Sequence, residues 1–226
     1  MEKINRFRQW IVVFFAFAFL ALFFLGINYY NENQPKMLYP GEIRDYQGEN
    51  LSSISDVINN AIRGTQYINA STYQLEVTGL VNKTLKMSYD ELINDFQTYQ
   101  KVVTLNCVQG WSAKILWEGF LVSDLLNNTG VNSNAVAAIF YASDGYSTSL
   151  PLEYLTSKNI MLANKMNGLM LPPERGFPFQ LVAESQYGYK WIKWLTKIEV
   201  TDNPDYLGTW EKQGYPNNAS IPTNLP

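Results

Sequence analysis

Hydrophobic residues fill the start of the chain without interruption. Residues Trp10 to Ile27 include no charged side chain and would be apolar on every face of a helix. A helix of about 20 apolar residues is long enough to cross a bilayer. Basic residues precede this run and acidic residues follow it, which predicts that residues 1–9 stay in the cytoplasm. We therefore expect residues 10–28 to be a transmembrane anchor or, alternatively, a cleaved signal, with a polar linker over residues 29–50.

Helical and strand patterns interleave irregularly over residues 51–205. Alternating or continuously apolar runs rich in β-branched residues predict strands, and apolar residues at helical spacing predict short helices. The expected strands are 73–81, 101–107, 135–142, 179–183 and 192–200, and the expected helices are 53–63, 89–96, 122–127 and 152–157. Because these elements do not form regular βαβ units, we expect a mixed-sheet α+β domain, with residues 206–226 as a C-terminal tail.

Composition narrows the chemistry that this domain can perform. The net charge of −3 and the pI near 5.1 provide no basic excess for binding nucleic acid. The chain has no histidine, which excludes Ser-His-Asp and Cys-His catalysis and histidine-held zinc or haem. Its single cysteine cannot form an intrachain disulfide or hold an iron–sulfur cluster alone. Metal or redox chemistry would therefore need a cofactor with few protein ligands.

Cys107 is the first candidate for such chemistry. It ends the strand predicted at 101–107 and is followed by Val108, Gln109, Gly110 and Trp111. A thiolate is a soft ligand that can hold a transition metal. A lone cysteine is also commonly a small buried hydrophobic residue, so the residue pattern alone leaves both interpretations open.

Three further segments combine turn residues with polar side chains. The proline-rich loop 171–179 carries Arg175, which could bind an anion or be a solvent-exposed side chain. The segment 187–194 alternates aromatic residues with two lysines, which is consistent with an anion-binding turn or with a strand whose lysines face water. The turn residues Asp144 and Gly145 precede Tyr146, which could be a working side chain or an exposed tyrosine of a hairpin.

Taken in order, these segments resemble a known family. The stretches 103–119, 140–154, 165–185 and 187–200 are similar to the core blocks of the sulfite oxidase and periplasmic methionine-sulfoxide-reductase type of molybdopterin-binding oxidoreductases. The resemblance implies a sulfite-oxidase-type fold and a molybdenum–molybdopterin cofactor, in which tungsten could replace molybdenum.

The family's site residues can be transferred by position. The resemblance implies that Cys107 is the thiolate ligand of the metal and that Tyr146 lies beside the metal-bound oxygens, so these two are the expected catalytic residues. The residues expected to bind the cofactor are Asn60, Ile62, Arg63, Cys107, Ser143, Asp144, Arg175, Gln180, Trp191, Ile192 and Lys193.

The chain departs from sulfite oxidases where they bind their anionic substrate. Gln109 and Trp111 occupy the stretch in which sulfite oxidases place arginines, and Gln180 stands where the family has another arginine. Fewer cations near the metal would weaken the binding of a dianion such as sulfite. We therefore expect a small neutral oxygen donor, such as a sulfoxide, rather than sulfite.

The resulting expectation is a membrane-anchored, extracytoplasmic oxidoreductase that carries molybdopterin and transfers an oxygen atom. A membrane cytochrome or a soluble electron carrier would be its redox partner, and no nucleic acid is expected to bind. The alternative is a cofactor-free module that binds a ligand or a protein on the same fold. The leader favours this alternative, because it reads Arg6-Phe7-Arg8 instead of the adjacent arginines with which folded molybdopterin enzymes are commonly exported.

Overall fold

The computed structural model describes residues 16–26 and 39–222, and the chain divides into two units, residues 1–37 and 38–226. In the first unit, residues 16–26 are helical. Within the described ranges, no helix combines the length and the apolarity that crossing a bilayer requires. The remaining parts of the predicted membrane segment, residues 10–15 and 27–28, lie outside the described residues.

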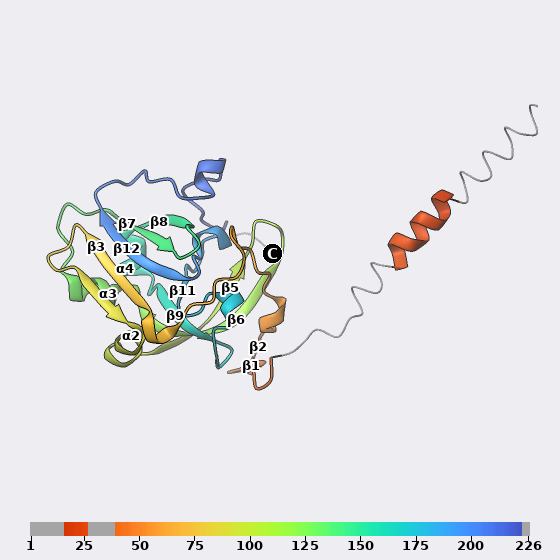
Figure 1. The fold of residues 1–226 in the computed structure, drawn as a ribbon, viewed down its shortest axis with the longest axis horizontal. Helices are drawn as coiled ribbons and strands as arrows, with labels where there is room; N and C mark the ends of the chain where they lie inside the picture. The colour runs from red at the N-terminus through yellow and green to blue at the C-terminus, as the bar shows by residue number, and fades with distance from the viewer. Residues whose placement is uncertain (1–15, 27–38, 223–226) are drawn as a thin grey trace, which may run out of the picture. The chain divides into compact units, whose positions relative to one another are not determined.

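A five-stranded antiparallel sheet includes the hairpin of β5 and β6 (Figure 1). Cys107 lies in the turn that connects these two strands. The central strand β6 pairs with β5 on one side and with β9 on the other, and β9 also pairs with β10 and β11. The strands of this sheet are β5 (Tyr99–Asn106), β6 (Ser112–Leu121), β9 (Met161–Met166), β10 (Leu169–Met170) and β11 (Gln180–Val182). The register of β6 on β9 shifts at Gly119, where a Cβ atom would lie 2.0 Å from the Leu162 carbonyl oxygen. Only glycine allows this close approach of the two backbones.

A second five-stranded sheet has the order β4-β3-β12-β7-β8. Its strands are β3 (Gln74–Gly79), β4 (Leu85–Ser88), β7 (Ala137–Ala142), β8 (Ser147–Pro151) and β12 (Leu195–Thr201). The pair β3–β12 is parallel, whereas the other pairs are antiparallel. The mixed-sheet α+β class expected from the sequence is therefore confirmed.

The two sheets share one hydrophobic core. Aromatic rings join the first sheet to helix α2 (Tyr89–Asp95): Phe179 lies 5.5 Å from Phe120 and 5.5 Å from Tyr89, measured between ring centroids. Each large apolar side chain removed from water stabilises the fold by about 1.5–3 kcal/mol. Trp117 is fully buried and contacts Trp191, so this core extends under the segment that carries Lys193.

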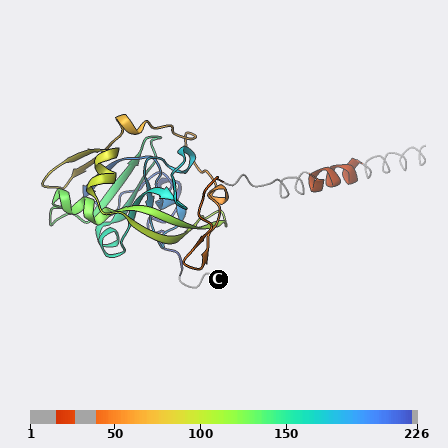
Figure 2. The ribbon, with the colours of Figure 1, turned by 90° about the horizontal axis from the view of Figure 1, so that it is seen from below.

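The three short α-helices described for this domain lie toward one side of it in both views (Figures 1 and 2). They are α2 (Tyr89–Asp95), α3 (Val122–Thr129) and α4 (Leu152–Ser157), each close to its predicted position. Ser88 accepts from the backbone N–H of Glu91, and the Glu91 carboxylate accepts from the backbone N–H of Ser88. This reciprocal capping box satisfies two N–H groups that would otherwise lack partners at the start of α2. Helices α2 and α3 lie on the same side of the domain in both views.

The helix predicted at 53–63 is wrong. Only the single 3-10 turn η1 (Ile54–Asp56) forms there, capped by Ser53, and Val57 is already extended. The segment after Val57 is non-helical because its amide side chains bond elsewhere: Asn59 donates to Thr65 Oγ1 at 2.9 Å and accepts from Lys193 Nζ at 2.5 Å. These bonds hold residues 57–62 along the pocket described below.

The described part of the linker is packed against the domain. Residues 39–50 include the hairpin of β1 (Asp45–Tyr46) and β2 (Glu49–Asn50). The Glu42 carboxylate accepts from Ser53 Oγ at 2.7 Å and from the Ile54 backbone N–H at 2.8 Å. These hydrogen bonds hold residues 39–50 against the rest of residues 38–226.

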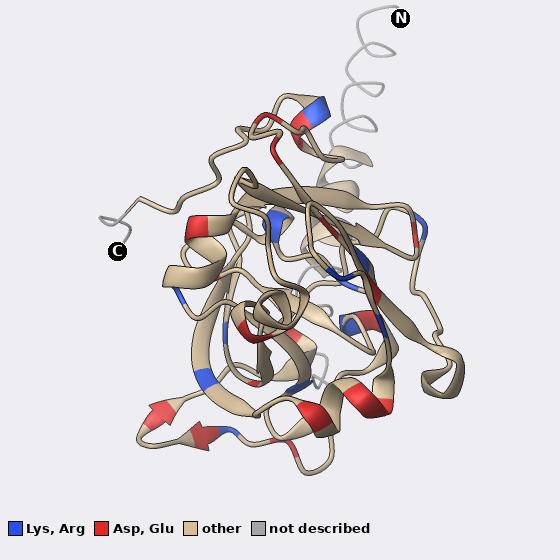
Figure 3. Cartoon of the chain, turned by 90° about the vertical axis from the view of Figure 1, so that its left-hand side faces the viewer, with Lys and Arg blue, Asp and Glu red and all other residues tan. Residues whose placement is uncertain are grey.

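Charged side chains are distributed over both sheets and the loops. Figure 3 shows acidic and basic residues interspersed, without one broad region of a single sign.

Candidate functional site

Cys107 occupies a tight turn at the end of β5. Its backbone N–H donates to the Trp111 carbonyl at 2.9 Å, and the Gly110 N–H donates to the Cys107 carbonyl at 3.0 Å. Gly110 has a φ of 90°, a conformation that glycine adopts without steric cost. On the other side, Gly188 packs against the turn, because a Cβ atom there would lie 3.8 Å from the Cys107 Cα. The turn therefore fixes the thiol in a cavity of about 370 Å³.

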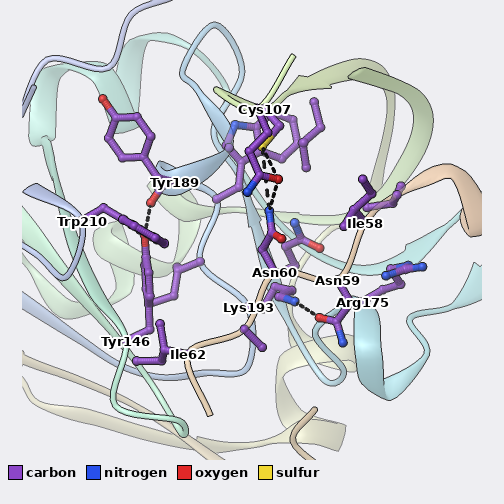
Figure 4. A pocket seen from close by; sticks show the side chains of 18 of the residues that line it. Ile58, Asn59, Asn60, Ile62, Cys107, Tyr146, Arg175, Tyr189, Lys193 and Trp210 are labelled. Carbon is purple, nitrogen blue, oxygen red and sulfur yellow. Dashed lines mark hydrogen bonds between the residues drawn. The ribbon is translucent and has the colours of Figure 1, made fainter. Parts of the chain in front are cut away.

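Two amide side chains are the polar neighbours of the Cys107 sulfur among the described residues. Asn60 Nδ2 lies 3.8 Å from Sγ, and Gln109 Oε1 lies 4.0 Å from it. Asn60 Nδ2 also donates to Gln109 Oε1 at 3.4 Å. Figure 4 shows the dashed contacts between these side chains at the top of the pocket. The surroundings of the thiol are polar but neutral.

Tyr146 reaches the same pocket from the β7–β8 hairpin. The Asp144 carboxylate accepts from the Tyr146 backbone N–H at 2.9 Å and fixes the turn. The Tyr146 hydroxyl donates to the Tyr189 carbonyl at 2.5 Å (Figure 4). Burial raises the pKa of Tyr146 above its ordinary value, and the charges of Glu211 and Asp144 raise it further. Tyr146 is therefore a neutral phenol at physiological pH, and its oxygen can accept a hydrogen bond from a bound molecule.

Arg175, the last residue of η3 (Pro173–Arg175), lines the pocket with its guanidinium group. The side chain is only 8% exposed, and its Nε donates to the Ile54 carbonyl at 3.2 Å. Its Nη1 is buried and has no hydrogen-bond partner within the described part of the chain. A buried donor without a partner costs about 1–3 kcal/mol, and more when it is charged. Such a group is suited to bind an anion.

Lys193 lies near Arg175 and shares its environment. A Cβ atom on Gly176 would come within 3.0 Å of the Lys193 side chain, so the glycine lets the loop of Arg175 pack against the lysine. Lys193 Nζ donates to Asn59 Oδ1 at 2.5 Å and to the Glu174 carbonyl at 3.3 Å. Burial, together with repulsion from Arg175, lowers the pKa of Lys193 to about 8. A bound anion would relieve this repulsion and stabilise the charged lysine.

Most of the site residues expected from the sequence line this one pocket. Those that do are Asn60, Ile62, Cys107, Asp144, Tyr146, Arg175, Gln180, Trp191, Ile192 and Lys193. Arg63 and Ser143 are exposed and do not line it. The Arg63 guanidinium lies beside Gly145, because a Cβ atom there would be 3.7 Å from it, and the Ser143 N–H donates to the Trp194 carbonyl. The roles of all these residues in cofactor binding remain predictions.

Sequence reasoning did not place Trp210 and Tyr215 in the pocket. Tyr189, Trp210 and Tyr215 line it together with Cys107, and Trp111 contributes a buried indole N–H that has no partner among the described residues. The aromatic density of segment 187–194 was a signal for Tyr189. Trp210 and Tyr215 had no such signal, because they come from the expected tail. Lys190 is fully buried, so the interpretation in which both lysines of segment 187–194 face water is wrong for this residue.

Comparisons with known proteins agree with this arrangement. A family model described as the oxidoreductase molybdopterin binding domain matches residues 62–210. The oxidoreductase YuiH of Bacillus subtilis is 33% identical over 150 residues, which cover 66% of this chain and 75% of that protein. A putative protein-methionine-sulfoxide reductase subunit, YedZ1 of Azospira oryzae, is 32% identical over 148 residues, which cover 66% of this chain and 56% of that protein.

Two further relatives share the domain within larger proteins. A nitrate reductase of Fusarium oxysporum is 33% identical over 58% of this chain, but the match covers 18% of that protein. Among solved structures, the sulfane dehydrogenase SoxCD of Paracoccus pantotrophus superposes with a TM-score of 0.59 at 24% identity, covering 62% of this chain and 41% of that chain. The SoxCD likeness supports the sulfite-oxidase-type fold.

Proposed function

Since the chain belongs to the family of oxidoreductases with a molybdopterin-binding domain, we propose that it reduces a small neutral oxygen donor of the sulfoxide class. The observation that carries this proposal is the neutral surroundings of Cys107. Its sulfur has the amides of Asn60 and Gln109 as hydrogen-bonding neighbours, whereas the cations Arg175 and Lys193 donate to the Ile54 carbonyl and to Asn59.

The residues present fit the molybdopterin cofactor. Cys107 offers one thiolate, which is the type of soft ligand that molybdenum takes from a protein. The unpartnered Nη1 of Arg175 and the adjacent Lys193 Nζ offer charge-assisted hydrogen bonds to an anionic chelate and its phosphate. Gly176, with a φ of 102°, holds these two cations close to each other. Cys107, Arg175 and Lys193 would therefore hold the group from separate segments of the chain.

When bound, the cofactor supplies two-electron oxygen-atom transfer, and the protein supplies binding, orientation and electrostatics. Tyr146 offers a neutral phenol oxygen beside this site, held by its bond to the Tyr189 carbonyl. The amides of Asn60 and Gln109 can orient a neutral S–O group without adding charge. In the overall reaction the S–O bond breaks, two electrons and two protons are taken up, and a thioether and water are released.

Anionic substrates suit this pocket less well. Binding an anion is favoured by cations that have no other partner, and each charge-assisted bond contributes about 1.5–3 kcal/mol. The side chains that hydrogen-bond the thiol are neutral, and Gln180, buried at 3% exposure, adds another uncharged side chain to the pocket. The similarity to a putative protein-methionine-sulfoxide reductase subunit also supports a sulfoxide over sulfite.

We further propose that the catalytic domain is tethered outside the cytoplasm. The support is the uncharged run Trp10–Ile27, with basic residues before it and acidic residues after it. An electron donor of the membrane-cytochrome or soluble-carrier class would supply the two electrons. Fractionation of the producing cells, followed by protease treatment of intact spheroplasts, tests both the tether and the side on which the domain lies.

The experiment that tests the proposed function is metal and pterin analysis of protein made in a host that synthesises the cofactor. We expect roughly one molybdenum per chain, following the single thiolate ligand, and reduction of dimethyl sulfoxide by a reduced viologen dye. Cys107→Ser should abolish this activity and change the electronic spectrum of the metal, while cofactor-free protein of both variants unfolds at the same urea concentration. Protein without pterin, from cells that load a control molybdoenzyme, would instead support the cofactor-free binding module.

A further inference from the structure

The C-terminal segment 206–221 is packed on the domain by hydrogen bonds. It runs along the outer edge of β8, where the Thr209 N–H donates to the Ser147 carbonyl at 2.8 Å and the Ser147 N–H donates to Thr209 Oγ1 at 2.9 Å. Further on, the Tyr187 N–H donates to the Ala219 carbonyl at 2.9 Å. These backbone bonds fasten the segment at both ends, so the residues between them are held in fixed positions.

A buried ion pair fixes the middle of this segment. Lys190 and Glu211 are both fully buried, and Lys190 Nζ lies 2.5 Å from Glu211 Oε1. Lys190 also donates to the Ser149 carbonyl at 3.0 Å and to Asn217 Oδ1 at 2.9 Å, while Thr148 donates to Glu211 at 2.8 Å. Because the pair links η4 (Gly188–Lys190) to η5 (Glu211–Gln213), it holds the residues that flank each turn at the pocket.

Three aromatic residues in or beside these two turns form an aromatic wall, which we define as Tyr189, Trp210 and Tyr215. The Tyr215 ring lies 5.3 Å from Trp210 and 5.3 Å from Tyr189 between centroids, in edge-to-face and tilted arrangements. The Tyr189 hydroxyl donates to the Pro216 carbonyl at 2.9 Å. The three side chains therefore support one another before any ligand binds.

The aromatic wall shares the pocket with Cys107 but lies apart from the cations. Figure 4 shows Trp210, Tyr146 and Tyr189 on one side, and Lys193 and Arg175 toward the other. Trp210 is 38% exposed, so part of its ring is open to the pocket and solvent. This side of the pocket offers apolar ring faces that a cofactor held by cations does not need.

We propose that Trp210 and Tyr215 determine substrate specificity by receiving the apolar substituent of the sulfoxide. The proposal rests on the proposed function, because it concerns which sulfoxides the same site accepts. A substrate whose S–O group points toward Cys107 would place its larger substituent against the aromatic wall. Aromatic and apolar substituents would then bind better than small or anionic ones, since ring contacts add to the burial of apolar area.

The test compares two sulfoxides of different size in the molybdenum-loaded enzyme. Trp210→Ala should lower the ratio of kcat/KM for methyl phenyl sulfoxide to kcat/KM for dimethyl sulfoxide by about tenfold, as expected for the loss of one aromatic contact and its buried area. Trp210→Phe should restore most of the ratio. Leu207→Ala is the matched control, because Leu207 is an exposed apolar residue of the same segment at 45% exposure and does not line the pocket.

A binding measurement separates specificity from turnover. Titration calorimetry of the loaded enzyme with methyl phenyl sulfide should give a dissociation constant about tenfold weaker for Trp210→Ala than for wild type and Leu207→Ala. Equal losses on both sulfoxides with unchanged sulfide binding would overturn this inference and leave the proposed function standing. A loaded wild-type enzyme that reduces neither sulfoxide would overturn the proposed function, and this inference with it.

Discussion

The buried pair of Lys190 and Glu211 should dominate the stability of the C-terminal segment. Both side chains are 0% exposed, and the lysine ammonium is satisfied by three oxygen atoms. Glu211→Gln removes the charge that balances Lys190 but keeps the shape of the side chain. Lys190→Met removes the opposite charge. In either case one uncompensated charge remains in the protein interior, where burial already lowers the pKa of Lys190.

The expected loss is large for a single substitution. Removing one partner of a buried ion pair costs about 3–5 kcal/mol of the free energy of unfolding. For a domain of this size, each kcal/mol lowers the melting temperature by about 2–4 °C, so each single variant should melt roughly 6–20 °C below wild type. The double variant Lys190→Met with Glu211→Gln should lose less than the sum of the singles, because it leaves no unpaired charge. Urea unfolding of cofactor-free protein, followed by tryptophan fluorescence, measures all four free energies.

The ion pair Lys197–Glu199 provides the comparison. Its side chains are 33% and 36% exposed, and its Nζ–Oε2 distance is 2.8 Å. An exposed pair contributes about 0–1 kcal/mol, so Glu199→Gln should change the free energy of unfolding by no more than that. If Glu211→Gln costs as little as Glu199→Gln, or if the double variant loses the full sum of the singles, then the pair does not fasten the segment as its burial indicates.

Two predictions concern the cations of the pocket. Arg175→Met should lower the retention of molybdenum after dialysis about tenfold or more, because a charge-assisted bond is lost. Cofactor-free Arg175→Met should be as stable as wild type or more stable, because the substitution removes a buried charge whose Nη1 has no partner among the described residues. Metal analysis measures the first effect, and urea unfolding measures the second. In cofactor-free protein the pKa of Lys193 is lowered, so above pH 8 the unfolded chain binds more protons than the folded chain. The free energy of unfolding of wild type, measured relative to Lys193→Met, should therefore rise by about 1–2 kcal/mol from pH 8 to pH 9.5. If this difference in the free energy of unfolding does not change between pH 8 and pH 9.5, the pKa of Lys193 is not lowered by its burial beside Arg175.

Elements defined by local chemistry could be predicted from the sequence. The capping box of Ser88 and Glu91 begins α2 as expected, and Cys107 follows its strand as expected. The strand β6 was not predicted. It is the central strand of its sheet, and residues Ile115, Leu116 and Trp117 are buried in succession, so the alternation that marks a half-buried strand is lost.

Residues whose partners are distant in the chain could not be placed. The helix predicted at 53–63 failed because Asn59 bonds to Lys193, a contact that no local pattern contains. Lys190 is buried because Glu211 reaches it from 21 residues later. In the same way, Trp210 and Tyr215 join the pocket only because the C-terminal segment follows the edge of β8. Tertiary context overrides local preference at each of these positions.

The two sides of the pocket differ in how many of their polar groups have partners within the protein itself. On the cationic side, Arg175 has a buried donor without a partner among the described residues, and Lys193 has a lowered pKa, so this side is strained until an anion binds. On the aromatic side, the rings pack on one another and the Tyr189 hydroxyl is already bonded, so this side is formed in advance. Binding of the cofactor should therefore relieve the repulsion between the two cations, whereas the aromatic side needs no rearrangement to receive a substrate. Substitutions on the two sides should consequently separate: those at Arg175 and Lys193 alter how much metal is retained, and those at Trp210 alter which sulfoxide is preferred at equal metal content.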